Sequence, residues 1–228
     1  MFRRLGERIH LKRKNFVICF TGIDGSGKTT HAVALVNFLN EMGYRCIYVR
    51  CALRPIFSYV FFAITRILGY WKKIRKNAYT NPLEYAPRNV AKKLGALLRL
   101  LFFLDFHIRI LFKVRLPLIF GKSVVCDRYF YDLLMELRYS NISTKKFEQI
   151  LSKTVPQPII TFLLDAHEMV ISNRRNFLKE EIKLRRQIFL NFKKSYGLFL
   201  IDSSMDFLEN QKTIRSLTLK RIRKSRNA

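Results

Sequence analysis

The stretch Gly22-Ile23-Asp24-Gly25-Ser26-Gly27-Lys28-Thr29-Thr30 decides the fold of this chain. It fits the pattern G-x-x-x-x-G-K-[ST] of the phosphate-binding loop known as the P-loop. An apolar run at 16–20 precedes it and predicts a buried strand, while a helical pattern of apolar residues follows it as far as Leu39. In such a strand–loop–helix unit, backbone N–H groups at the start of the helix converge on a phosphate. A glycine-rich turn that binds no nucleotide is the alternative interpretation.

The residues of the loop predict an ATP site with bound Mg²⁺. Lys28 adds a positive charge toward the β- and γ-phosphates, and the Thr29 hydroxyl is placed to hold Mg²⁺. A valine-rich strand at 123–126 delivers Asp127, which fits the second Mg²⁺-binding element of P-loop proteins. The residues expected to bind ATP are Gly22, Asp24, Gly25, Ser26, Gly27, Lys28, Thr29 and Thr30, and those expected to hold the metal are Thr29 and Asp127.

The net charge of +27 over 228 residues is the most unusual feature of the composition. It favours anionic partners, such as nucleotides, nucleic acid or an anionic membrane surface, although a solvated basic surface explains it equally well. The sequence predicts one domain over 15–219, between a basic arm at 1–14 and a basic tail at 220–228. The four cysteines form no C-x-x-C pair, and no stretch has the length of uncharged apolar sequence that a membrane span needs. These features predict a cytoplasmic protein.

Apolar runs alternate with helical patterns along the chain. Five runs predict strands, at 16–20, 45–49, 123–126, 159–165 and 198–202. Continuous apolar strands separated by helices are typical of a parallel sheet that is covered on both faces. The predicted fold is therefore α/β, with three layers built on a five-stranded parallel sheet. Ligands of such sheets bind at the carboxyl ends of the strands, where the P-loop and Asp127 lie.

The order of these elements, together with four short segments, resembles the thymidylate kinase family of P-loop nucleoside monophosphate kinases over about 16–219. The segments are Phe20–Asp24, Asp127-Arg128-Tyr129, Phe162–Asp165 with Arg174 and Arg175 after it, and Ile201-Asp202. The resemblance implies the P-loop NTPase fold with a short lid at about 170–186. It also implies transfer of a phosphoryl group from ATP, with Mg²⁺, to a nucleoside monophosphate, in the first place dTMP. Members of the family commonly form homodimers, for which the helix predicted over 97–112 offers a surface.

The resemblance also implies roles for individual residues. Asp24 would lie beside the sugar and phosphate of the acceptor, and Arg128 would contact the acceptor phosphate. Arg54 would grip the same phosphate, and Phe103 would stack on the acceptor base. Arg174 and Arg175 would lie in the lid, where an arginine stabilises the transferring phosphoryl group. The implied catalytic set is Lys28, Arg128, Arg174 and Arg175.

Each of these assignments has a structural alternative. Asp24 could simply favour the start of the helix, and Asp127 and Arg128 could form an ion pair at the end of a strand. Phe103 could be an ordinary core residue in an apolar helix, and Arg54 could be a surface charge. The two arginines of the predicted lid could be solvated at helix ends.

Three departures from the family pattern gather on the acceptor side. His107 stands where the family usually has an arginine, one helical turn after Phe103; it could bind the acceptor base or be a core histidine. Asp132 stands where a small residue is more common, and 55–95 carries extra residues. A second hypothesis therefore keeps ATP but changes the acceptor to another nucleotide, a nucleoside or a non-nucleotide metabolite. A third is a P-loop ATPase that binds nucleic acid or a membrane through its basic termini.

Overall fold

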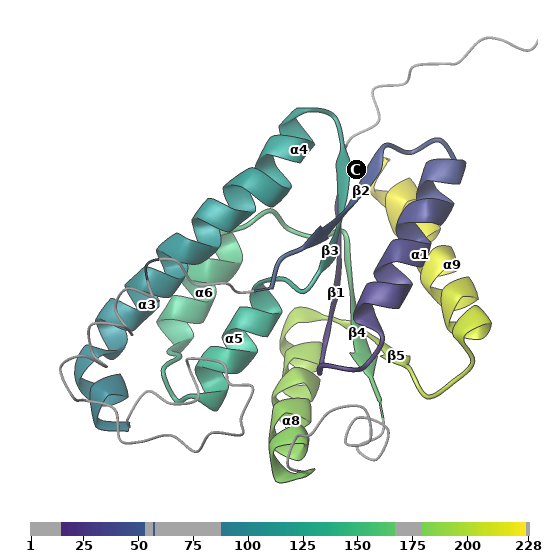
Figure 1. The fold of residues 1–228 in the computed structure, drawn as a ribbon. Coiled ribbons are helices and arrows are strands. Elements are labelled where there is room, and N and C mark those ends of the chain that lie inside the picture. The colour runs from purple at the N-terminus through teal and green to yellow at the C-terminus, as the bar shows by residue number, and fades with distance from the viewer. Residues whose placement is uncertain (1–14, 53–56, 58–87, 167–178, 227–228) are drawn as a thin grey trace, which may run out of the picture.

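A parallel sheet forms the centre of the molecule (Figure 1). The computed structural model describes residues 15–52, 57, 88–166 and 179–226. Within these residues the sheet has five strands, all parallel, in the order β2-β3-β1-β4-β5. The strands are β1 (Val17–Gly22), β2 (Cys46–Arg50), β3 (Ser123–Asp127), β4 (Ile160–Asp165) and β5 (Phe199–Asp202). The predicted sheet is confirmed, and the strand that leads into the P-loop lies at its middle.

Helices cover both faces of the sheet and complete the three layers (Figure 1). The helices are α1 (Lys28–Glu41), α3 (Arg88–Ile110), α4 (Leu116–Ile119), α5 (Phe130–Tyr139), α6 (Lys145–Thr154), α8 (Lys179–Tyr196) and α9 (Phe207–Arg226). On one face, buried side chains of α3, α5, α6 and α8 form a core with the sheet. On the other face, α1 and α9 form a second core. This arrangement confirms the predicted three-layer α/β fold.

The strand register brings the chemistry-bearing residues to one edge of the sheet. β1 is buried along its whole length because it lies between β3 and β4. Phe20 pairs with Asp127 on one side, and Gly22 pairs with Leu164 on the other. The carboxyl ends of these strands therefore place the P-loop beside Asp127, as expected for a ligand site in a parallel sheet.

Three helical segments differ from the sequence prediction. α3 begins at Arg88, before the predicted start, and a π-helical turn, η2 (Leu111–Arg115), joins it to α4. Pro117 does not end this path, because it lies in the first turn of α4, where a helix needs no N–H partner. α6 was not predicted; Thr144 caps it by accepting a hydrogen bond from the Phe147 N–H at 3.3 Å. α9 continues to Arg226, beyond the predicted end at 219.

None of the helices in the described part of the chain has the length and apolar character that crossing a membrane requires.

Candidate active site

The P-loop adopts a conformation that its glycines make possible. Gly22, Gly25 and Gly27 have positive φ angles of 137°, 92° and 85°. At Gly22 a Cβ atom would also lie only 2.3 Å from the carbonyl oxygen of Leu164 in β4. Only glycine combines this backbone angle with such a close approach of two strands. The loop is thereby fixed against the centre of the sheet.

Lys28 is the first residue of α1, and its side chain reaches back to the start of the P-loop. Its side chain is buried, and Nζ donates hydrogen bonds to the carbonyl oxygens of Gly22 at 2.8 Å and Ile23 at 2.7 Å. The Asp24 carboxylate lies 3.6 Å from the same nitrogen. Burial and the nearby Arg128 lower the pKa of Lys28, while Asp24 opposes this change. The ammonium group is thus held at the loop that would receive the phosphates.

Thr29 and Asp127 meet where a metal is expected. The Thr29 hydroxyl donates to Asp127 Oδ2 at 2.6 Å, and the Tyr48 hydroxyl donates to the same oxygen at 2.8 Å. Asp127 is buried, and its Oδ1 has no hydrogen-bond partner among the described residues. Burial and the bond to Asp127 raise the pKa of Tyr48 to about 12, so its phenol stays a donor. A hydroxyl and one carboxylate suit Mg²⁺, which typically takes its remaining ligands from water and substrate phosphates.

Arg128 joins the P-loop from the neighbouring strand. It has a positive φ of 68°, unusual for a residue with a side chain, and its N–H donates to the Phe20 carbonyl at 2.8 Å. This backbone turn directs the guanidinium to Asp24, with which it forms an ion pair. Burial alone would lower the pKa of Arg128, but the carboxylates of Asp24 and Asp132 raise it. Arg128 is therefore a fixed positive charge beside Lys28.

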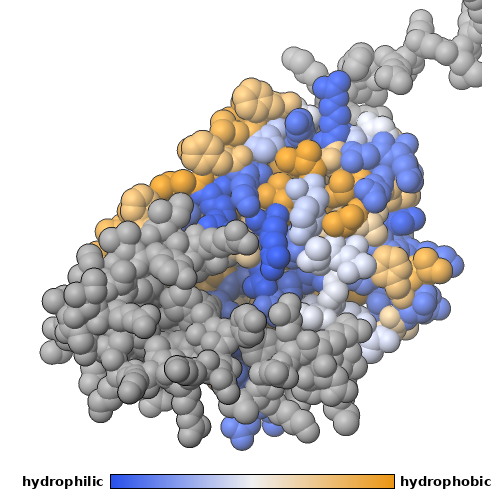
Figure 2. Space-filling view, in the orientation of Figure 1, coloured by the Kyte–Doolittle hydropathy of each residue, from blue (hydrophilic) through white to orange (hydrophobic). Residues whose placement is uncertain are grey.

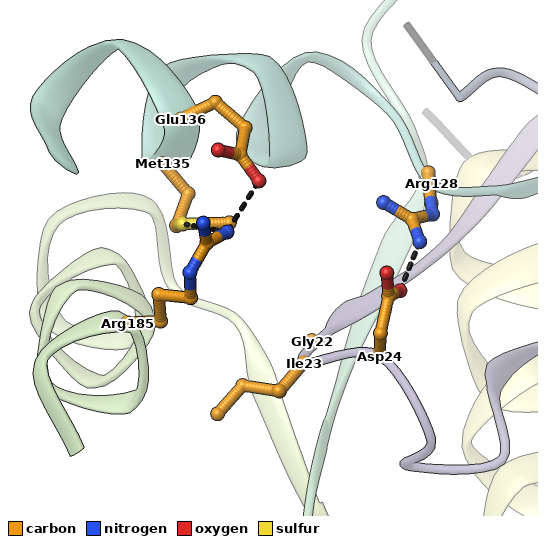
Figure 3. Close-up of a pocket in the computed structure, with 7 residues that line it drawn as sticks. All are labelled: Gly22, Ile23, Asp24, Arg128, Met135, Glu136 and Arg185. Atoms are coloured by element: carbon orange, nitrogen blue, oxygen red, sulfur yellow. Dashed lines mark hydrogen bonds and ion pairs between the residues drawn. The ribbon is translucent and has the colours of Figure 1, made fainter. Parts of the chain in front are cut away.

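A small pocket opens between the P-loop and two helices on one face of the sheet (Figure 3). Its volume is about 20 Å³, and its lining residues are Gly22, Ile23, Asp24, Arg128, Met135, Glu136 and Arg185. Arg185 of α8 forms an ion pair with Glu136 of α5 at 2.5 Å. Sequence reasoning missed both residues, because neither belongs to a motif and they lie 49 positions apart. The only signal was the basic cluster around 183–186.

Several proteins similar to this chain are named probable thymidylate kinase. The chain is 28% identical over 209 residues to the one from Sulfurisphaera tokodaii, and the match covers 87% of this chain and 93% of that protein. It is 30% identical over 155 residues to one of Pyrococcus horikoshii, covering 67% of this chain and 65% of that protein. A third, of Pyrococcus abyssi, is 27% identical and covers 82% and 85%. Over most of its length the chain is therefore similar to thymidylate kinases. No family model matches it.

A solved thymidylate kinase also shares the fold. The enzyme from Ehrlichia chaffeensis superposes with a TM-score of 0.55 at 20% identity, covering 90% of this chain and 98% of that one. At 20% identity this similarity is evidence for the fold alone. It agrees with the parallel sheet and its two helical layers.

Phe103 and His107, which the family resemblance assigns to the acceptor base, both contact α6. Their rings lie 3.8 Å apart, and Phe103 also meets Phe147 edge-on at 6.4 Å. His107 Nδ1 lies 2.8 Å from the Phe103 carbonyl oxygen, and Nε2 lies 2.9 Å from the Thr154 hydroxyl. Burial lowers the pKa of His107. Both ring nitrogens thus have protein partners, and neither residue lines the pocket beside Arg128.

Phe103 lines a different cavity, between α3 and α6. This cavity has a volume of about 400 Å³ and shares no lining residue with the pocket at the P-loop. Its walls include Phe147 and Ile150 of α6, together with Arg99 and Leu100 of α3. Among the described residues, Phe103 and the P-loop thus line two different pockets, and the base-stacking role stays a prediction.

Asp132, the other departure from the family pattern, is a structural carboxylate. It accepts hydrogen bonds from the Thr21 hydroxyl at 2.8 Å and from the Tyr129 N–H at 3.0 Å. These bonds tie the end of β1 to the start of α5, just after Arg128. Burial raises the pKa of Asp132 to about 6, although Arg128 and Lys28 oppose this change. A small residue at this position would lose both bonds.

Arg54 and the lid arginines Arg174 and Arg175 lie outside the described residues. Next to the expected lid, Asp165 accepts two hydrogen bonds from Arg186, at 2.8 and 2.7 Å. Its own carbonyl oxygen also accepts from the Ser203 hydroxyl at 2.8 Å. Asp165 thus links α8 to the end of β5.

Proposed function

We propose that this protein transfers the γ-phosphoryl group of ATP to a nucleoside monophosphate, with dTMP as the acceptor. The observation that carries the proposal is the meeting of two sets of residues at one loop. Lys28, Thr29 and Asp127 form the donor side, and Arg128 with Asp24 forms the acceptor side. The names of the relatives support dTMP as the substrate.

The reaction needs no nucleophilic side chain. An oxygen of the acceptor phosphate forms a bond to the γ-phosphorus, and the bond from that phosphorus to the bridging oxygen breaks. ADP leaves and dTDP is the product. The acceptor oxygen is already anionic, so the protein has to bring two phosphates that repel each other together and offset the developing charge.

The residues at the loop supply that charge. The P-loop N–H groups would cradle the donor phosphates, and Lys28 would exchange its loop carbonyls for phosphate oxygens. Thr29 and Asp127 would hold Mg²⁺, which neutralises charge on the phosphates when bound. Arg128 would hold the acceptor phosphate, and the Asp24 carboxylate keeps its guanidinium aimed at the loop.

The other assigned residues complete the proposal. Arg54, Phe103 and His107 would contact the acceptor, and Arg174 and Arg175 would close over ATP from the lid. The contacts of His107 with α6 leave the second hypothesis, a different acceptor, as the main competitor.

We also propose that the outer face of α3 and α4 packs against a second copy of the chain. Apolar side chains gather along this edge (Figure 2). Leu100, Leu104, Ile108 and Phe112 follow one another at helical spacing and are 53%, 42%, 36% and 63% exposed. Exposed apolar stripes of this length commonly mark interaction surfaces.

ADP release from ATP, measured by a coupled assay with dTMP and Mg²⁺, tests the function. Removing an electrostatic contact made in the transition state typically costs 10²–10³ in rate, or about 3–4 kcal/mol. We therefore expect Lys28→Ala and Arg128→Ala each to lower turnover at least a hundredfold. Lys194→Ala, an exposed cation of α8, is the matched control and keeps full turnover. Thermal melting verifies that each variant is folded.

Near-normal turnover of either site variant contradicts the mechanism. Activity with another acceptor, but none with dTMP, keeps the mechanism and replaces the substrate.

A further inference from the structure

Two guanidinium groups face the small pocket at the P-loop from opposite sides (Figure 3). Arg128 reaches Asp24 from the end of β3, while Arg185 extends from α8 toward Glu136 of α5. Each arginine thus pairs with a carboxylate at the rim of the same space. Arg185 has no part in the function proposed above, although it lines the same pocket as Arg128.

Arg185 is positioned by its neighbours as well as by its ion pair. Its residue is only 7% exposed, its guanidinium carbon lies 4.4 Å from the centre of the Tyr139 ring, and one nitrogen lies 3.9 Å from the Met135 sulfur. Burying a charge in this way is costly unless it is well paired. A cation kept in such a place is therefore expected to have a use beyond joining two helices.

The ion pair with Glu136 is an incomplete one. Glu136 Oε1 accepts a hydrogen bond from Arg185, but Glu136 Oε2 is buried without a hydrogen-bond partner among the described residues. The same helix offers a contrast in Arg138, whose Nε and Nη2 bind both oxygens of Glu148 at 2.7 and 2.6 Å. A two-bond pair is more specific in geometry and stronger than a one-bond pair. The contact between Arg185 and Glu136 is thus the easier of the two to exchange.

We propose that Arg185 is a second phosphate-binding arginine of this site, and that Glu136 holds it only until a phosphate enters the pocket. This inference rests on the proposed function. A volume of about 20 Å³ takes about one water molecule, so a phosphoryl group needs more room than the pocket has. In the proposal, movement of Arg185 away from Glu136 provides that room. A phosphate offers the guanidinium the same planar, charge-assisted pairing that a carboxylate does, with more oxygens to bind.

The group that Arg185 would bind is a terminal phosphoryl group. It comes either from the acceptor, whose phosphate Arg128 would hold across the pocket, or from the γ-position of ATP. The chemistry is the same in both cases, and paired ligands separate them. Thymidine and dTMP differ only in the acceptor phosphate, and ADP and ATP differ only in the γ-phosphate.

Calorimetric titration of the full-length protein with these four ligands, the nucleotides with Mg²⁺, tests the proposal. Arg185→Lys is expected to lower the affinity for dTMP at least tenfold without changing that for thymidine, or to lower the affinity for ATP at least tenfold without changing that for ADP. Glu136→Gln is expected to change the same affinity in the opposite direction, because Arg185 loses its competing carboxylate. Arg138→Lys, which alters the complete ion pair on α5, leaves all four affinities unchanged.

Two results overturn the proposal. One is an Arg185→Lys variant that keeps its affinity for both dTMP and ATP. The same holds if the variant loses as much affinity for thymidine as for dTMP, and as much for ADP as for ATP. The other is a Glu136→Gln variant that weakens binding as much as Arg185→Lys does, which would make the pair a structural link. If Arg185→Lys fails to fold, the direction of the Glu136→Gln change alone decides.

Failure of the proposed function gives a different pattern. In that case the wild-type protein does not bind dTMP, whatever Arg185 does. The comparison of ATP with ADP still tests the γ-phosphate. Protection of the wild-type protein and of Arg185→Lys against thermal unfolding by orthophosphate then tests the acceptor position, and equal protection of both counts against the proposal.

Discussion

Replacement of Gly22 by alanine tests the close contact between β1 and β4 that fixes the P-loop. Gly22 has a φ of 137°, and an added Cβ would lie 2.3 Å from the Leu164 carbonyl oxygen and 3.2 Å from its carbon. Both atoms belong to the backbone of a central strand, so neither can swing aside. The substitution therefore has to separate β1 from β4 at the point where the loop begins.

The expected cost has two parts. Holding a residue with a side chain at this φ costs about 1–3 kcal/mol. Relieving the clash by moving a packed strand costs a further 1–3 kcal/mol or so. We expect Gly22→Ala to lower the free energy of unfolding by about 2–6 kcal/mol, a large share of the roughly 5–15 kcal/mol typical of a domain. The shift would also displace the Gly22 carbonyl that accepts from Lys28.

Gly197→Ala is the matched control. Gly197 also has a positive φ, of 66°, but an added Cβ would meet nothing within 4 Å. This variant should lose only about 1 kcal/mol, from backbone strain alone. Urea denaturation of both variants measures the difference. Equal losses at the two positions would refute the reasoning, because they would mean that the contact with Leu164 contributes nothing.

Three further predictions concern separate features. Because burial raises the pKa of Asp132 to about 6, above about 4 in the unfolded chain, its contribution to stability falls as the pH rises between these values. The difference in unfolding free energy between wild type and Asp132→Asn should therefore fall by about 2 kcal/mol from pH 4 to pH 7, and a constant difference would contradict the burial of this charge. Tyr48→Phe removes one of the two hydroxyls on Asp127 and should raise the Mg²⁺ concentration for half-maximal ADP release several-fold; an unchanged Mg²⁺ requirement would count against the proposed metal site. Leu104→Glu should lower the mass measured by light scattering to that of one chain, whereas a wild-type protein that is already monomeric would end the dimer proposal.

The sequence predicted the structure well where the conformation of a short segment depends on its own residues. The apolar run before the loop, the glycines and the helical pattern after it predicted β1, the P-loop and α1, because each depends on neighbours in the chain. Asp127 and Arg128 could be placed for a similar reason. They end an apolar strand, and parallel strands bring their carboxyl ends to one edge.

Contacts between distant segments could not be predicted in this way. The ion pair between Glu136 and Arg185 depends on how α5 packs against α8, and the sequence around neither residue indicates its partner. The side-chain directions of Phe103 and His107 could not be predicted for a related reason. Helix α3 is apolar on several faces, so its sequence does not say which face packs against α6 and which against the sheet. Thr144 was a usable signal for α6, since it precedes apolar residues at helical spacing.

The central claim is that donor and acceptor phosphates meet between Lys28 and Arg128. The most direct measurement is ADP release by the full-length protein with ATP and Mg²⁺, with and without dTMP, and with dTDP quantified in the same samples. We expect ADP release to require dTMP, ADP and dTDP to form in equal amounts, and Arg128→Ala to lower both at least a hundredfold. ADP release that is independent of dTMP, or that Arg128→Ala leaves intact, would contradict this mechanism.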